Sequence, residues 1–246
     1  MKGTMKGTKG VLCTLVSAIL LASCNMSNTA KGGLIGSTAG GAAGAGLGAA
    51  IGALIGGSKG AKVGASIGAG VGVAGGTTAG VLIGKKMDKA KAAAEAALED
   101  ATVETTTDTN GLEAVKVTLD NGILFKVGKS NLQSAAQSSL KKFATNVLNV
   151  YTDCDVAIYG YASSDGSDAT NMALSQSRAA AVKAYLTTSC GVSEGQIKST
   201  TGFGETPEYL VLDANGKEDK EASRRVEIYL YASEAMINAA NAGTLQ

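Results

Sequence analysis

The chain has 246 residues, of which 45% are apolar and 34 are glycine, and its formal net charge at neutral pH is +1. So small a charge gives no electrostatic basis for binding nucleic acid. The chain contains no histidine, which excludes histidine-based acid–base catalysis, the Ser-His-Asp triad and the commonest metal ligand. We therefore expect a binding or structural protein rather than an enzyme, with no metal site and no cofactor.

Residues 1–23 have the layout of an export signal, with lysines at positions 2, 6 and 9 before a short apolar run. That run is too short for a membrane span. It ends in Leu21-Ala-Ser-Cys24, which resembles the lipobox of bacterial lipoproteins and implies an acylated Cys24 within an anchor and short tether, residues 24–33. Asn25, where inner-membrane lipoproteins usually carry Asp, implies the outer membrane. The alternative is an ordinary cleaved signal with an incidental cysteine.

Residues 34–84 are expected to form a glycine-zipper helical hairpin. Between positions 32 and 84, 20 of 53 residues are glycine, and 14 of these fall at every fourth position. A flexible linker has no use for such a register, whereas helices that pack closely in lipid do. Two uncharged stretches, 34–57 and 63–84, are each long enough to span a bilayer, and Ser58-Lys-Gly-Ala-Lys62 separates them. The pattern resembles the glycine-zipper hairpins of small envelope lipoproteins.

Two alternatives stay open for this segment, a disordered low-complexity linker and a helical hairpin buried in an oligomer. Residues 85–110 follow with a charged, alanine-rich part and then a threonine-rich part. The alanine-rich part predicts a solvated helix. The threonine-rich part predicts a flexible joint that holds the next domain away from the membrane.

Residues 111–233 predict a globular domain of the α+β class, with a mixed sheet and two helices on one face. Residues 114–119 alternate in polarity and, with residues 123–125, predict a β-hairpin about Asp120-Asn-Gly122. Residues 234–246 are expected to be a C-terminal tail. The other expected elements are helices at 134–149 and 168–189 and strands at 155–159, 196–201 and 225–231.

Four sequence blocks occur in a fixed order: VAIYGYASSDG from Val156, NMALSQSRA from Asn171, GFGETP from Gly202 and SRRVEI from Ser223. They resemble the OmpA-like C-terminal domain, and with the lipobox and zipper the whole chain is similar to the YiaD-like lipoproteins. The resemblance implies a β-α-β-α-β domain that binds the diaminopimelate of peptidoglycan stem peptides without cutting it.

Arg178 is the principal candidate for ligand contact. Leu174, Arg178, Val182 and Leu186 recur every four residues, so Arg178 shares the apolar stripe of its helix. A buried guanidinium needs a carboxylate partner. That partner is either the carboxylate of the ligand or an internal acid such as Asp165 or Glu227.

Asn171, on the same face, is expected to hydrogen-bond either the ligand or the preceding loop. One block departs from the family pattern, because G-H-T-D is replaced by Gly160-Tyr-Ala-Ser163. The aspartate expected to meet the ligand's ammonium is therefore Ser163, and Asp165 is the candidate substitute. The resemblance also places Arg225 among the binding residues. Residues 208–222 predict a solvated loop near the site, and their carboxylates do not follow calcium-loop spacing.

Cys154 precedes a strand and Cys190 ends the following helix, so an antiparallel packing of that helix predicts a disulfide between them, with two free thiols as the alternative. The leading functional hypothesis is an outer-membrane lipoprotein, with its C-terminal domain in the periplasm, that tethers the membrane to peptidoglycan. The alternative is a glycine-zipper membrane homo-oligomer or assembly factor that the C-terminal domain only positions.

Overall fold

The computed structural model describes residues 78–108 and 112–245. The expected signal sequence, the lipidation site at Cys24 and the zipper hairpin up to residue 77 lie outside the described residues. Within the described ranges, none of the helices combines the length and the apolar character that crossing a membrane requires.

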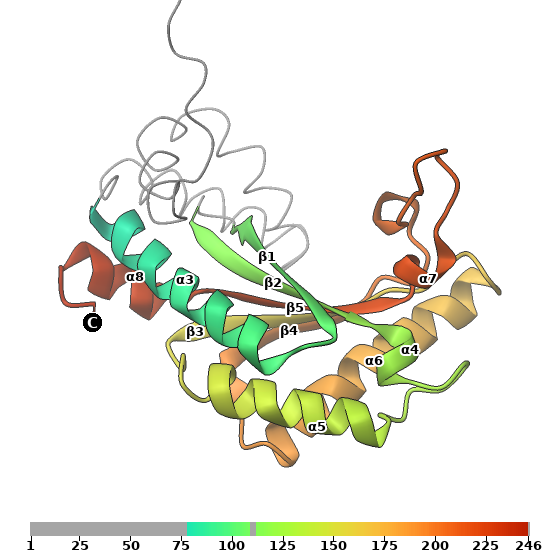
Figure 1. Cartoon of the computed structure of the whole chain (residues 1–246), viewed down its shortest axis with the longest axis horizontal. Coiled ribbons are helices and arrows are strands. Elements are labelled where there is room, and N and C mark those ends of the chain that lie inside the picture. The colour runs from blue at the N-terminus through green and yellow to red at the C-terminus, as the bar shows by residue number, and fades with distance from the viewer. Residues whose placement is uncertain (1–77, 109–111, 246) are drawn as a thin grey trace, which may run out of the picture.

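The described chain is built on one mixed sheet of five strands in the order β1-β2-β5-β3-β4 (Figure 1). Neighbouring strands are antiparallel except β3 and β4, which are parallel and are joined through helix α6. The strands are β1 (Ala101–Thr107), β2 (Glu113–Asp120), β3 (Cys154–Gly160), β4 (Ile197–Gly202) and β5 (Arg225–Ala232).

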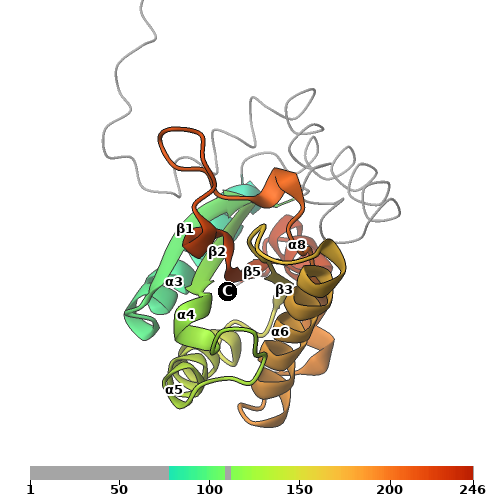
Figure 2. The same ribbon diagram turned by 90° about the vertical axis from the view of Figure 1, so that its right-hand side faces the viewer.

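The longer helices share one apolar core with one face of this sheet (Figure 2). They are α3 (Thr78–Ala97), α5 (Ser134–Phe143), which continues as the π-helical η1 (Ala144–Leu148), α6 (Asp168–Thr188) and α8 (Glu234–Asn241). Short elements complete the chain: α4 (Asn121–Leu124), η2 (Glu194–Gln196), η3 (Pro207–Tyr209) and α7 (Lys220–Ser223). The α+β class, with the helices at 134–149 and 168–189 on one face of a mixed sheet, is confirmed.

The expected β-hairpin at residues 114–125 is wrong. Residues 121–124 form the helical turn α4, because Asp120 caps it by accepting a hydrogen bond from the amide of Gly122, 2.6 Å away. The antiparallel hairpin partner of β2 is instead β1, at residues 101–107. Glu104 of β1 lies opposite Lys116 of β2, and their side chains form a 2.6 Å ion pair.

Residues 85–110 are also not the solvated helix and flexible joint that the sequence predicted. The helix forms, but it starts at Thr78 and packs along the sheet, where Ile83 and Met87 are almost fully buried. The last seven residues of the expected zipper, 78–84, thus belong to a helix of the domain core. The expected C-terminal tail contains α8, whose Met236 and Ile237 are buried in the same core.

The expected disulfide is absent, since Cys154 and Cys190 are both free thiols. Cys154 starts β3 on its core side, where burial and then Asp153 raise the pKa of its thiol and Lys86 of α3 acts in the opposite direction. Cys190 lies instead beside Tyr185 of α6 and near Lys141 of α5. The two thiols therefore have different surroundings although their elements are adjacent.

Candidate ligand-binding site

The four sequence blocks meet where β3, β4 and β5 approach the N-terminal half of α6. Helix α6 begins at Asp168, because Ser167 caps it by accepting a hydrogen bond from the amide of Thr170, 3.3 Å away. Asp168 in the first turn suits the positive end of the helix dipole. The position of this first residue determines which part of the sheet is faced by the side chains of the second sequence block, residues 171–179.

Two glycines let α6 lie unusually close to the sheet. A Cβ on Gly160, at the end of β3, would lie 2.3 Å from the carbonyl oxygen of Ser175, and a Cβ on Gly202 would lie 2.2 Å from the amide nitrogen of Gln176. The close approach allows hydrogen bonds between helix and strand ends: Gly202 N–H donates to Gln176 Oε1 (2.7 Å) and Gly204 N–H to Ser175 Oγ (2.9 Å). Ser175 and Gln176 of the second sequence block therefore hold α6 against the end of β4.

Asn171 holds the loop that precedes α6. Its amide nitrogen donates to the carbonyl oxygens of Ser163 (3.1 Å) and Asp165 (2.9 Å) and also contacts the carboxylate of Glu205. The residue is buried. Of the two roles predicted for Asn171, the structure shows the contact with the loop backbone.

Arg178 lies 2% exposed beneath the loop that joins α4 to α5. Its Nε donates to the carbonyl oxygen of Lys129 (3.1 Å), and its guanidinium carbon lies 5.4 Å from the centre of the Phe125 ring. Neither internal acid that the sequence offered as a partner reaches it, because Asp165 pairs with Lys220 and Arg224, and Glu227 pairs with Arg225. Within residues 78–108 and 112–245, Arg178 forms no ion pair.

The charge of Arg178 is thus left without a counter-charge among the described residues. Burial, and then the neighbouring charge of Arg224, lower the pKa of Arg178 to about 10. It therefore remains a cation at neutral pH. Among the described residues only Nε of this guanidinium donates a hydrogen bond, and two Nη groups of an arginine can hold a carboxylate through two parallel hydrogen bonds.

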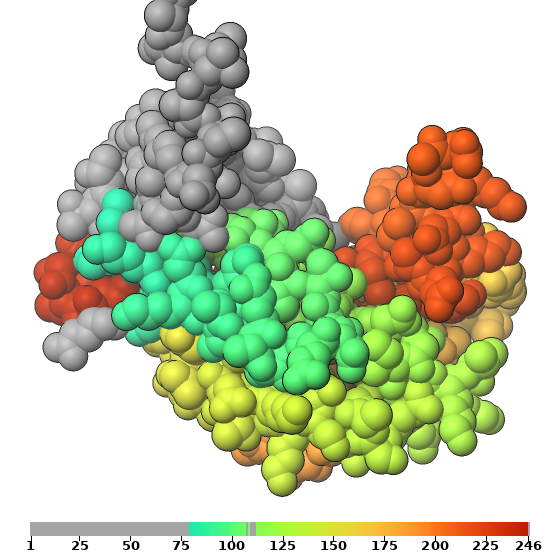
Figure 3. All heavy atoms as spheres, in the orientation of Figure 1, coloured from blue at the N-terminus to red at the C-terminus, as the bar shows by residue number. Residues whose placement is uncertain are grey.

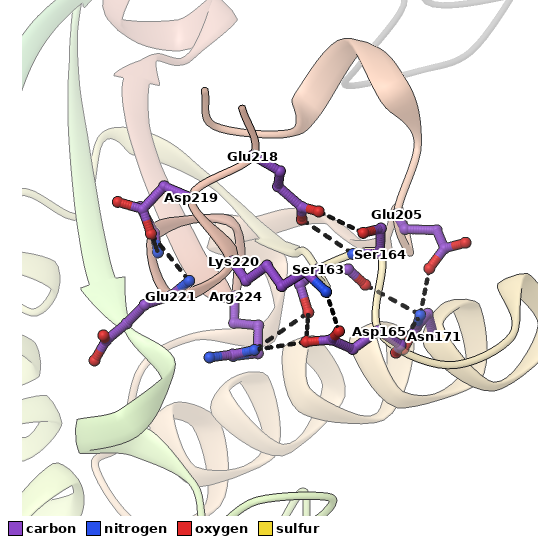
Figure 4. A network of polar contacts seen from close by, with 11 residues as sticks. Ser163, Ser164, Asp165, Asn171, Glu205, Glu218, Asp219, Lys220, Glu221 and Arg224 are labelled. Carbon is purple, nitrogen blue, oxygen red and sulfur yellow. Dashed lines mark hydrogen bonds and ion pairs between the residues drawn. The ribbon is translucent and has the colours of Figure 1, made fainter. Parts of the chain in front are cut away.

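A polar network surrounds the loop at Ser163 (Figure 4). Asp165 contacts Lys220 through one carboxylate oxygen, and its other oxygen lies 3.3 Å from Nη1 of Arg224 and 3.3 Å from the Ser163 hydroxyl. Arg224 Nη1 is also 3.3 Å from the Ser163 hydroxyl. The contact with Lys220 is the main reason that the pKa of Asp165 is lowered.

The cations of this network come from the segment between β4 and β5, which projects from the body as a lobe (Figure 3). Glu218 of this lobe joins it to the loop after β3 by accepting hydrogen bonds from the amide (3.0 Å) and the hydroxyl of Ser164. Asp219 caps the short helix α7 and so sets the position of Lys220 and Arg224. The expectation of a loop near the site at residues 208–222 agrees with this arrangement.

Arg225 has a different environment from the other predicted site residues. Its Nε donates to Glu227 (2.7 Å), its Nη1 donates to the carbonyl of Tyr209 (3.1 Å), and its guanidinium carbon lies 4.1 Å from the centre of the Tyr161 ring. Arg225 faces the sheet surface opposite the helices, next to an aromatic cluster centred on Tyr159 and Tyr161. The structure does not join Arg225 to the network of Ser163 and Asp165.

Hydrogen bonds and ion pairs join Asn171, Ser163 and Asp165 to one another and to Arg224 and Lys220, two residues that sequence reasoning missed. Arg178 contacts Lys129 and Phe125 instead, and the charge of Arg224 is what links it to this network. Arg224 stands in the fourth block beside Arg225, but the block gives no sign of which arginine faces the loop. The alternation of β5 decides this, because the side chain of Val226 enters the core and that of Arg225 points the other way.

Residues 124–225 match the sequence model of the OmpA family. The C-terminal domain is OmpA-like. Outer membrane porin F of Pseudomonas aeruginosa is 32% identical over 124 residues, which is 49% of this chain and 34% of the relative. Outer membrane protein A of Shimwellia blattae is 39% identical over 90 residues, 36% of each chain. This chain thus spans about a third of the length of these two relatives.

Among solved structures, the cell wall anchor of the T6SS from Pseudomonas aeruginosa is 22% identical. Its TM-score is 0.46, and the match covers 60% of this chain and 97% of that one. In the OmpA-like domain of the present chain, the family-model match includes Arg178, the loop at Ser163, and Arg224 and Arg225.

Proposed function

We propose that this protein is an outer-membrane lipoprotein whose OmpA-like domain binds peptidoglycan noncovalently and tethers the membrane to the cell wall. The observation that carries the binding role is the buried guanidinium of Arg178, which has no counter-ion among the described residues. Diaminopimelate in the stem peptide supplies a carboxylate of the kind that a guanidinium binds in two parallel hydrogen bonds. The role is one of binding, without chemistry on the wall.

The membrane half of the proposal is based on the sequence alone. Cys24 would carry the lipid, and the glycine-zipper segment would associate with the membrane. Multiple acyl chains give stable anchoring where a single chain does not. Helix α3, which the structure describes from Thr78, packs in the core of the wall-binding domain. The segment between the lipid and this domain therefore ends before residue 110.

Cosedimentation of the full-length chain, in detergent, with purified diaminopimelate-containing peptidoglycan tests the binding role. The wild type should pellet with the wall, and Arg178→Ala should remain in the supernatant. Lys198→Ala is the matched control, because Lys198 pairs with Asp155 at the opposite end of β3. If the wild type stays in solution, or if both variants pellet equally well, the wall-binding role of this site is refuted.

A further inference from the structure

Within the described residues the sheet ends at β4 on one side and at β1 on the other, and the β4 edge is closed. The side-chain amide of Gln176 donates to the carbonyl oxygen of Thr200 (3.3 Å) and accepts a hydrogen bond from the amide of Gly202 (2.7 Å). This amide thus takes the place of a neighbouring strand. The same strand also carries the exposed Lys198. Covering groups and lysines of this kind keep other strands from pairing with a sheet edge.

The β1 edge has a different character (Figure 2). Among the described residues, β2 is the only strand that pairs with β1, and the pairing runs through all seven residues without a register shift, so no bulge turns the edge away. The strand contains no proline, and the charge of its one acid, Glu104, is matched by Lys116 of β2. An edge with these properties can accept a further strand.

The composition of β1 indicates which strand fits best. Its sequence, ATVETTT, consists mostly of β-branched residues, which are enriched in strands. Residues 34–77 of the same chain are instead rich in glycine and alanine, which are depleted in strands. A second copy of β1 is therefore a better partner for this edge than the N-terminal segment. Two copies related by a two-fold axis would pair antiparallel, and each would cover the edge of the other.

Charge and packing together select the register of such a pair. With Glu104 opposite itself, two like charges would lie directly across the strands, which is destabilising. With the two-fold axis at Val103, Glu104 of each copy lies opposite the exposed Thr102 of the other. Val103 lies opposite Val117 of β2 and is half-buried against the core. A pair of Val103 side chains across the axis would therefore join the two cores.

We infer that this protein forms a homodimer through antiparallel pairing of β1 with β1 of a second copy, centred on Val103. The inference goes beyond the proposed function and does not depend on it, because no residue of the candidate ligand site belongs to β1. Strand β1 also lies outside residues 124–225, which match the OmpA family. A dimer of this kind presents two copies of the domain to one polymer, which strengthens binding through multivalency.

Cross-linking of the full-length chain in detergent tests the contact directly. Side chains directly opposite each other in an antiparallel pair have Cβ atoms about 4.5–5.5 Å apart. A short bifunctional thiol reagent should therefore join two chains of the Val103→Cys variant. Thr118→Cys is the matched control, because Thr118 lies on β2, inside the sheet, about 14 Å from its copy across three strand spacings. It should give no more dimer than the wild type, which shows the background from the native cysteines.

The register is tested by charge at Thr102 in the Val103→Cys background. Thr102 is exposed, so the fold should accept either charge. Thr102→Glu places a second acid opposite Glu104 twice, by symmetry, and should lower the yield of cross-linked dimer about tenfold in dilute protein. Thr102→Lys places opposite charges there and should keep the yield or raise it.

Three results would overturn the inference. The first is a yield of dimer from Val103→Cys no higher than from the wild type or from Thr118→Cys. The second is an equal yield from the two Thr102 variants, since association through another surface, such as the glycine-rich segment, would not sense charge at this position. The third is a higher yield from Thr102→Glu than from Thr102→Lys. Cosedimentation with peptidoglycan is a separate measurement, so the proposed function and the dimer can fail independently.

Discussion

The guanidinium of Arg178 lies against the ring of Phe125, 5.4 Å from its centre, in the part of the core where α6 meets the loop after α4. A ring face attracts a cation, but it does not replace a carboxylate. Arg178 is therefore a buried charge that the described fold only partly compensates. Such a residue weakens the fold unless a ligand uses it.

Replacement of Arg178 by Met should separate stability from binding. The substitution keeps most of the side-chain volume and removes a buried charge without a counter-ion, so the free energy of unfolding should stay within about 1 kcal/mol of wild type or rise. Binding to peptidoglycan should be lost. Urea unfolding and cosedimentation measure the two effects. A loss of about 3 kcal/mol or more in stability would show that Arg178 serves the fold instead.

The elements that the sequence predicted well are those with a clear period. The alternation of residues 114–119, in β2, and the four-residue stripe of α6 both report burial directly. Arg178 was found because a charge interrupts that stripe. Lys220 and Arg224 lie in or beside a short helix of an irregular segment, where no period indicates which side chains turn inward.

The errors have physical causes as well. Four of the buried positions in α3 are alanines, namely Ala79, Ala90, Ala94 and Ala97. Because alanine buries little apolar area, the sequence pattern predicted a solvated helix. In β1 the threonines and Val103 have high β propensity, but the polarity of the stretch suggested a joint. Both elements are held by tertiary contacts with β2.

Truncating buried side chains of α3 tests whether this helix belongs to the domain. Ile83→Ala and Met87→Ala each remove a side chain that is no more than 1% exposed, and each should lower the free energy of unfolding by about 2–5 kcal/mol. Lys89→Ala, on the exposed side of the same helix, should change it by less than about 0.5 kcal/mol. Chemical denaturation of the full-length chain gives all three values. Near-neutral effects of both truncations would mean that α3 is not part of the cooperative core.

The contact between α6 and β4 should tolerate no side chain at Gly202. A methyl group there would lie 2.2 Å from the backbone nitrogen of Gln176, so Gly202→Ala must move the helix and should destabilise the fold by about 2–3 kcal/mol. Gly195→Ala is the control, since the nearest atom to its added Cβ is a serine oxygen 3.6 Å away. Thermal unfolding should show a clearly lower Tm for the first variant only. The same shift in α6 should weaken peptidoglycan binding, because Arg178 moves with the helix.

The thiol of Cys154 should make stability depend on pH in the alkaline range. Burial raises the pKa of this thiol from 9.0 to about 12, so between these values the unfolded chain has lost the proton that the native chain keeps. Stability contributed by the protonated thiol is complete below pH 9 and falls by about 1.4 kcal/mol per pH unit above it. Cys154→Ala removes this dependence but leaves the titration of lysines and tyrosines unchanged.

The difference between the two proteins, measured by urea unfolding from pH 8 to pH 10.5 under reducing conditions, therefore isolates the thiol. The wild type should lose stability more steeply than Cys154→Ala above pH 9, and the two slopes should agree below it. Cys190→Ala is the control, because Cys190 is only half-buried and should change the slope less. Parallel curves for wild type and Cys154→Ala would mean that the thiol ionises in the native protein as readily as in the unfolded chain. That result would contradict its burial at the start of β3.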